Sequence, residues 1–189
     1  MHLTIYRTPV FKQILYAVSV VGLKLTGWRI VGTPPKEKKY VLVAAPHTSN
    51  WDFPVLLAMA CVLGFEIYWM GKKSLFPKPL APLMHWLGGI SIDRDKAHNR
   101  VELTIDAYNS RENLKIVIPP AGTRTASKNW KTGFYHIAVG ANVPLGLGFL
   151  DFAKKEGGFL GTFYPTGDIE KDLPLIQKYY EGIKGKNDN

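Results

Sequence analysis

The chain of 189 residues is 46% hydrophobic and 21% charged, which is typical of one globular domain over residues 1–189 and excludes a disordered chain. Its single cysteine, Cys61, excludes a disulfide framework and a cysteine-rich zinc site, and it favours a reducing compartment. The net charge of +9 predicts an acidic partner, which is nucleic acid, a phosphorylated metabolite or an anionic lipid surface.

The first 39 residues carry two-thirds of the charge surplus, a net +6. Within them, residues 14–23 form an apolar run that is too short for the roughly 20 residues of a membrane span. The sequence after this run is also a poor signal-peptide cleavage site. Flanking basic residues and Trp28 predict a helix within residues 1–27 that lies on a membrane surface. A terminal helix packed on the protein core is the alternative.

Short β-rich runs alternate with helical patterns along the rest of the chain. We expect strands at 40–45, 66–70, 90–92, 114–118, 144–150 and 159–163, with a hairpin turn at 154–158. We expect helices at 53–63, 97–109 and 132–141, and a last amphipathic helix that ends at Gly185. Strands separated by helices predict an α/β sandwich, in which helices flank a central, mostly parallel sheet.

Several common catalytic motifs are absent from the sequence. It has no Gly-rich dinucleotide loop, no P-loop, no nucleophile elbow and no H-E-x-x-H motif. Dinucleotide binding, P-loop hydrolysis, serine hydrolase chemistry and zinc protease chemistry therefore lose support. We expect no cofactor and no metal.

One histidine has a carboxylate at a suggestive spacing. His47 follows the strand at 40–45, and Asp52 comes five residues later, before the apolar helix. Five helical residues turn through about 500°, so the two side chains meet only if His47 lies in the turn and Asp52 begins the helix. Pro54 fits that helix start. Asp52 would then hold one imidazole nitrogen and leave the other free as a general base, although a purely structural pair is the alternative.

Two further segments end predicted strands with glycine or proline and an arginine, at 88–94 and 119–124. If the strands are parallel, both segments and the His47 turn open at the carboxyl edge of one sheet, where α/β folds bind ligands. In this order the blocks resemble the glycerolipid acyltransferase family, which includes lysophosphatidate acyltransferase. The H-x-x-x-x-D, G-x-x-x-I-D-R and P-E-G-T-R motifs of that family correspond to residues 47–52, 88–94 and 120–124. Residues 71–76 are also similar.

The resemblance implies the glycerol-3-phosphate acyltransferase fold and an activity. Such enzymes move a fatty acyl group from an acyl-CoA or acyl-carrier-protein thioester to a hydroxyl of a lysophospholipid, at the cytoplasmic face of a membrane as peripheral or monotopic proteins. The resemblance implies that His47 is the general base and that Asp52 orients it. It implies that Arg94 and Arg124 hold the acceptor phosphate. The full set of substrate-binding positions is Lys72, Lys73, Arg94, Ala121, Gly122, Thr123 and Arg124.

One position departs from the family pattern, because Ala121 stands where the third motif has glutamate. A methyl group can neither accept a hydrogen bond nor position a charged neighbour. The sequence therefore leaves a second hypothesis, a catalytically impaired lipid-binding protein on the same fold. Nucleic-acid binding has only the net charge in its favour, because no RNA- or DNA-binding motif is present, and we expect no nucleic-acid partner.

Aromatic residues near the motifs have two interpretations. They line an acyl groove or fill the core, and the sequence does not separate these roles for Phe53, Trp69, Phe76 and Trp86. Cys61, inside the apolar helix, is expected to be inert core.

Overall fold

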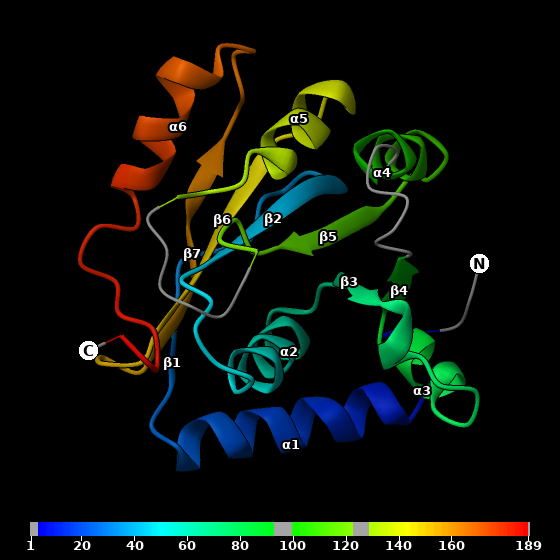
Figure 1. Ribbon diagram of the computed structural model, residues 1–189. Helices are drawn as coiled ribbons and strands as arrows, with labels where there is room; N and C mark the ends of the chain where they lie inside the picture. The colour runs from blue at the N-terminus through cyan, green and yellow to red at the C-terminus, as the bar shows by residue number, and fades with distance from the viewer. Residues whose placement is uncertain (1–3, 93–99, 123–128, 189) are drawn as a thin grey trace.

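A seven-stranded sheet forms the middle layer of the protein (Figure 1). The computed structural model describes residues 4–92, 100–122 and 129–188. The strands lie in the order β1-β7-β6-β2-β5-β3-β4, and every neighbouring pair is parallel except β6 and β7. Their bounds are β1 Arg29–Val31, β2 Lys39–Ala45, β3 Tyr68–Lys72, β4 Gly89–Ile92, β5 Leu114–Ile118, β6 Leu145–Asp151 and β7 Glu156–Phe163. The predicted α/β fold with a mostly parallel sheet is confirmed.

Helices cover both faces of the sheet. On one face α1 packs against α2, and α4, α5 and α6 lie on the other (Figure 1). The α-helices and the 3₁₀ turn η1 have the bounds α1 Phe11–Leu25, α2 Asp52–Leu63, η1 Lys73–Leu75, α3 Ala81–Trp86, α4 Arg100–Asn109, α5 Gly133–Gly140 and α6 Ile169–Lys178. Within the described ranges, no helix is long and apolar enough to cross a bilayer.

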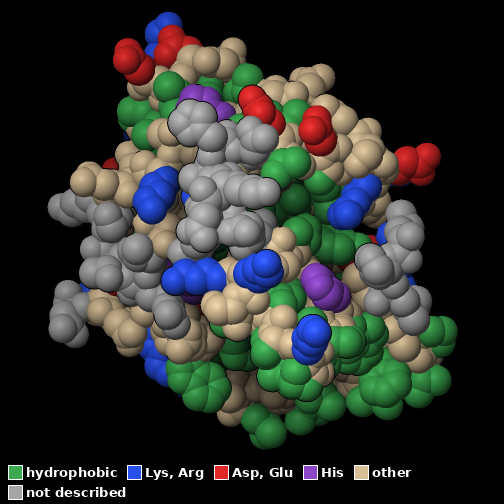
Figure 2. All heavy atoms as spheres, turned by 45° about the vertical axis from the view of Figure 1, so that its right-hand side comes forward, with side chains coloured by type: hydrophobic (Ala, Val, Ile, Leu, Met, Phe, Trp, Pro, Cys, Tyr) green, Lys and Arg blue, Asp and Glu red, His purple; other side chains and the backbone are tan. Residues whose placement is uncertain are grey.

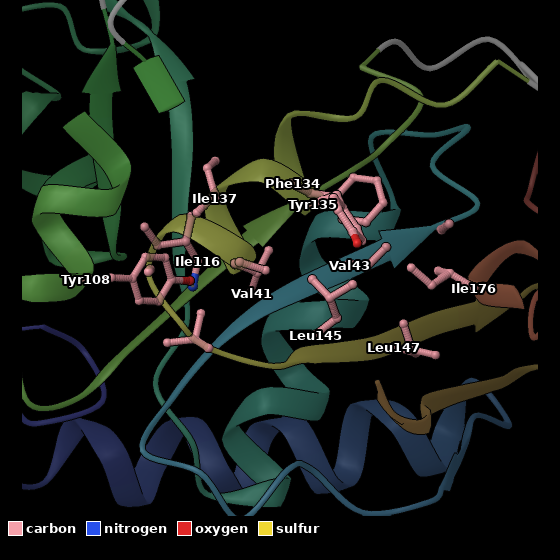
Figure 3. Packing of buried hydrophobic residues seen from close by; sticks show 14 of the residues in the cluster. Val41, Val43, Tyr108, Ile116, Phe134, Tyr135, Ile137, Leu145, Leu147 and Ile176 are labelled. Atoms are coloured by element: carbon pink, nitrogen blue, oxygen red, sulfur yellow. The ribbon is translucent and has the colours of Figure 1, made fainter. Parts of the chain in front are cut away.

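The central strand β2 divides the core into two layers, because alternate side chains of a strand point to opposite faces. Val41 and Val43 belong to the cluster under α4, α5 and α6, where Tyr108 and Phe134 are buried (Figure 3). The neighbouring Tyr40 and Leu42 pack instead toward α1 and α2. β2 is therefore buried on both sides, as its continuous apolar sequence predicts.

The structure corrects five sequence expectations. β7 begins at Glu156 and the turn before it spans 152–155, so the hairpin turn lies earlier than the expected 154–158. β3 begins two residues later than expected, and the last helix ends at Lys178, with turns in place of its expected final residues up to Gly185. β1 and α3 were not expected at all, because a three-residue strand and a six-residue helix are too short to show a hydrophobic period. β1 lies so close to β7 that a Cβ at Gly158 would approach the Val31 carbonyl oxygen to 2.1 Å.

Candidate active site

A histidine–aspartate pair occupies the loop between β2 and α2. Nδ1 of His47 lies 2.8 Å from Oδ2 of Asp52, the first residue of α2. His47 therefore lies in the turn and Asp52 begins the helix, which is the arrangement the sequence spacing required. The His47 side chain is 29% exposed and that of Asp52 is 9% exposed. The imidazole is reachable from solvent, whereas its carboxylate partner is shielded.

The backbone of the same loop fixes the Asp52 carboxylate. Oδ2 accepts hydrogen bonds from the backbone N–H groups of Thr48 and Ser49, each at 3.0 Å, in addition to its contact with His47. An ionised carboxylate only accepts hydrogen bonds, so His47 Nδ1 carries the proton and Nε2 keeps its lone pair. The geometry thus presents Nε2 as a base and provides a negative charge to stabilise the imidazolium.

A large cavity, which we call the apolar cavity, opens on one side of this pair. Its volume is about 740 Å³, and its walls come from the start of α2, from β3 and from the ends of β5 and β6. Most of its lining is apolar and includes Phe53, Leu56, Trp69, Met70 and Phe149. A cavity of this size and composition fits a hydrocarbon chain.

A second cavity, the C-terminal cavity, lies on the other side of His47. It measures about 830 Å³ and is bounded by α6 and the residues that follow it. Its wall includes the polar and charged side chains of Gln177, Lys178, Glu181 and Asp188. Both cavities share Ala45, Pro46 and His47 in their linings. His47 therefore lies at the boundary between the two cavities.

The structure separates the predicted substrate-binding residues. Lys72 and Gly122 line the apolar cavity, and Ala121 lines the C-terminal cavity beside His47. Lys73 is exposed in η1 and belongs to neither lining. Three predicted residues lie outside the described residues, namely Arg94, Thr123 and Arg124. The carboxyl ends of the parallel strands β2, β4 and β5 do lie along one edge of the sheet, as expected.

The aromatic residues take different positions. Phe53 and Trp69 line the apolar cavity, with ring centroids 5.3 Å apart. Phe76 stacks behind Trp69 at 5.7 Å, and Trp86 packs on the core cluster toward α1 and α2. Of the four aromatic residues, two therefore face the space in which an acyl chain would lie.

The segment 184–188 docks on the His47 loop, which the sequence did not predict. Asn187 donates a side-chain hydrogen bond to the Thr48 carbonyl oxygen at 2.7 Å, and its backbone N–H donates to Thr48 Oγ1 at 3.2 Å. Gly185 packs so closely that a Cβ there would approach Thr48 Oγ1 to 2.4 Å. These contacts join residues 139 positions apart, and no short motif announces them.

No metal site accompanies the pair in the part of the chain that the structure describes. In these ranges no group of three or more His, Cys, Asp or Glu side chains is arranged to hold a metal ion. The chemistry available at the loop, from its described side chains, is therefore that of an imidazole base supported by a carboxylate.

A family model and a solved structure match this chain. The family model described as Acyltransferase matches residues 29–146. Among solved structures, the chain is similar to the crystal structure of the 1-acyl-sn-glycerophosphate (LPA) acyltransferase PlsC from Thermotoga maritima. The TM-score is 0.63 at 14% sequence identity, and the match covers 92% of this chain and 77% of that chain. A comparison with curated proteins finds no match.

Proposed function

This chain belongs to the acyltransferase family, and we propose that it transfers a fatty acyl group from a thioester to a hydroxyl of a lysophospholipid such as lysophosphatidate. The donor is an acyl-CoA or an acyl-carrier protein. The observation that carries the proposal is the His47–Asp52 pair, whose histidine lines two cavities that have different walls. An acyl transfer between two substrates needs a base at the point where they meet.

In the proposed reaction, Nε2 of His47 takes the proton of the acceptor hydroxyl as its oxygen attacks the thioester carbonyl carbon. The tetrahedral adduct collapses, the carbon–sulfur bond breaks, and the leaving thiolate takes the proton back from the imidazolium. Asp52 stabilises the imidazolium between these two steps. The products are an ester and a free thiol, and no acyl-enzyme forms.

The cavities divide the substrates between them in this proposal. The apolar cavity takes the fatty acyl chain, because Phe53, Leu56 and Trp69 offer it an apolar wall. Lys72 is the last residue of β3 and lines the same cavity, where its ammonium group is suited to bind the polar end of a lipid. Arg94 and Arg124 retain the role that the family resemblance gives them, which is to hold the acceptor phosphate.

We also propose that α1 holds the protein on an anionic membrane surface at the cytoplasmic face. Phe11, Ile14, Val18, Val21 and Leu25 are spaced by three or four residues, and each is at least 53% exposed. They form one apolar stripe, whereas Ser19 and Leu23 on the same helix are buried. α1 thus both packs on the core and exposes an apolar face.

Further apolar side chains extend the stripe beyond α1. Leu75, Leu80 and Leu83 are exposed in and beside η1 and α3. In the view of Figure 2, apolar side chains gather along the lower edge of the face, whereas Asp and Glu lie higher up. This separation suits a surface that meets lipid tails and anionic headgroups.

A catalytically impaired lipid-binding protein is the second candidate function, and Ala121 favours it. Ala121 lines the C-terminal cavity beside His47. The glutamate of the family motif is therefore absent from the position at which an acceptor hydroxyl would approach the base. The two candidates share a lipid-binding surface and differ in turnover.

Thiol release separates these candidates. The purified protein is mixed with acyl-CoA or acyl-carrier protein and with a panel of lysophospholipids in vesicles, and free thiol is followed with a chromogenic reagent. The proposal expects thiol release that depends on the acceptor and disappears in His47→Ala. Lysolipid binding without any thiol release across the panel would favour the impaired protein.

A further inference from the structure

A pocket of about 300 Å³, which we call the amino-edge pocket, lies far along the strands from the His47 loop. It is built where β5 and β3 begin, between the start of α1 and the end of α2, whereas His47 follows the end of β2. Tyr6, Lys12, Glu66 and Lys115 line it. Nothing in the proposed reaction uses this pocket.

The ammonium group of Lys115 is the unusual feature of the pocket. Lys115 is only 8% exposed. Its Nζ donates to Asn113 Oδ1 at 2.7 Å and lies 5.7 Å from the centre of the Tyr40 ring. In the described part of the chain no carboxylate forms an ion pair with it. Buried charges are normally paired, because removing an ammonium from water costs several kcal/mol.

The carboxylate in the pocket wall is already occupied. Glu66 Oε1 accepts from Arg7 Nε at 2.6 Å and from Thr4 Oγ1 at 3.1 Å, and Oε2 accepts from Arg7 Nη2 at 2.9 Å. Glu66 and Arg7 therefore neutralise each other in a two-point ion pair. Lys115 and the exposed Lys12 remain as the surplus positive charge of the pocket wall.

The charged form of Lys115 is disfavoured in this position. Burial lowers the pKa of its ammonium group, and no carboxylate among the described residues pairs with it. The Tyr6 hydroxyl is buried beside the backbone of Ile67 and offers no donor to a ligand. An anion in the pocket would compensate the ammonium.

We propose that the amino-edge pocket binds a phosphate group, supplied by an anionic phospholipid headgroup or by a free phosphate. The ammonium groups of Lys115 and Lys12 are donors, and a phosphate has enough oxygens to accept from both. The volume accommodates a phosphate together with a small substituent. Lys12 and Leu15 of the wall belong to α1, whose exposed apolar stripe is the surface proposed to meet the membrane.

Binding is tested by calorimetric titration with inorganic phosphate. Every titration uses an Arg94→Ala, Arg124→Ala background, which removes the arginines proposed to hold the acceptor phosphate. In this background the amino-edge pocket is tested independently of the proposed reaction. Lys115→Met keeps the length of the side chain and removes the ammonium. Lys38→Met is the matched control, because Lys38 is exposed just before β2 and lies outside the pocket.

We expect Lys115→Met to weaken phosphate binding about tenfold, the effect of losing one charge-assisted hydrogen bond, and Lys38→Met to leave it unchanged. Lys12→Met, on the exposed rim, should weaken binding about threefold without any risk to the core. Equal phosphate affinity in the background protein and in both pocket variants would overturn the proposal, and so would absence of binding in the background protein.

Vesicles identify the source of the phosphate. Co-sedimentation is compared on vesicles of phosphatidylcholine with and without phosphatidylglycerol. If Lys115→Met loses more binding to the anionic vesicles than Lys38→Met does, the ligand is a lipid headgroup. If the two variants bind vesicles equally while Lys115→Met has lost phosphate affinity, the pocket takes free phosphate.

Discussion

Asp52→Asn tests how the His47 loop holds its base. The substitution keeps the shape of the side chain and removes its negative charge. From the sequence alone, an amide permits either imidazole tautomer, so the variant would be expected to behave like a loss of His47. The structure leads to a different expectation, because Thr48 and Ser49 both donate backbone N–H groups to Oδ2.

These two donors fix the orientation of the new amide. If the amide nitrogen occupied the Oδ2 position, the backbone N–H groups of Thr48 and Ser49 would lose their acceptor. These two residues are only 3% and 7% exposed. Such a loss costs about 1–3 kcal/mol for each group. The amide oxygen therefore takes the Oδ2 position and still accepts from His47 Nδ1, so the tautomer is preserved.

The charge is lost, and the amide nitrogen takes the Oδ1 position, which is buried and has no partner among the described residues. The contribution of the charge sets the size of the effect on the rate. A hydrogen bond to a charged partner is worth about 1.5 kcal/mol more than a neutral one, which corresponds to roughly tenfold in rate. We expect acceptor-dependent thiol release to fall about tenfold in Asp52→Asn, and the protein to stay folded with a lower melting temperature, because the buried amide N–H groups have no acceptor among the described residues. In Asp52→Ala both loop donors are unpaired, so activity and stability should fall together.

Two results would refute this reasoning. Activity within threefold of the parent protein would mean that the carboxylate charge does not support the imidazolium. A folded Asp52→Asn protein as inactive as His47→Ala would mean that the backbone donors do not select the tautomer.

Three further changes test the surrounding structure. Replacing Phe11, Val18 and Leu25 by serine should release the protein from anionic vesicles in a co-sedimentation assay, and unchanged sedimentation of the folded variant would exclude this stripe as the anchor. Raising the salt from 0.1 M to 1 M should weaken vesicle binding by the parent protein, because the Debye length falls from about 10 Å to about 3 Å. Ala121→Glu should raise thiol release about tenfold if it restores one hydrogen bond to a charged group near the acceptor, and no gain would show that this chain works without the motif glutamate. Asn187→Ala removes one hydrogen bond to Thr48 and should lower turnover about fivefold. Turnover equal to that of the parent protein would show that Asn187 does not position the loop.

The parts of the molecule that the sequence predicted are those set by local patterns. The β2 strand was predicted because six successive apolar residues favour a strand that is buried on both faces, and five of the six, all but Ala44, are buried. The contact between His47 and Asp52 was predicted because a strand end, a turn and a helix start lie within a dozen residues. In both cases short-range geometry leaves few alternatives.

The parts that the sequence did not predict depend on distant contacts. Asn187 reaches Thr48 only because α6 returns the chain to the carboxyl edge of the sheet, and no pattern near either residue records that path. The burial of Lys115 is hidden in the same way, since a lysine in a strand normally indicates a solvent-facing position. The two cavities beside His47 also result from how distant elements pack.

The most direct test of the central claim is acceptor-dependent thiol release by His47→Ala beside the parent protein, with melting temperatures measured for both. Asp52 retains its two backbone donors in this variant, so the loop is expected to keep its conformation and the melting temperature to stay unchanged. We predict that turnover falls about 10²- to 10⁴-fold, the range of general-base assistance. Thiol release within threefold of the parent protein would contradict the assignment of His47 as the base.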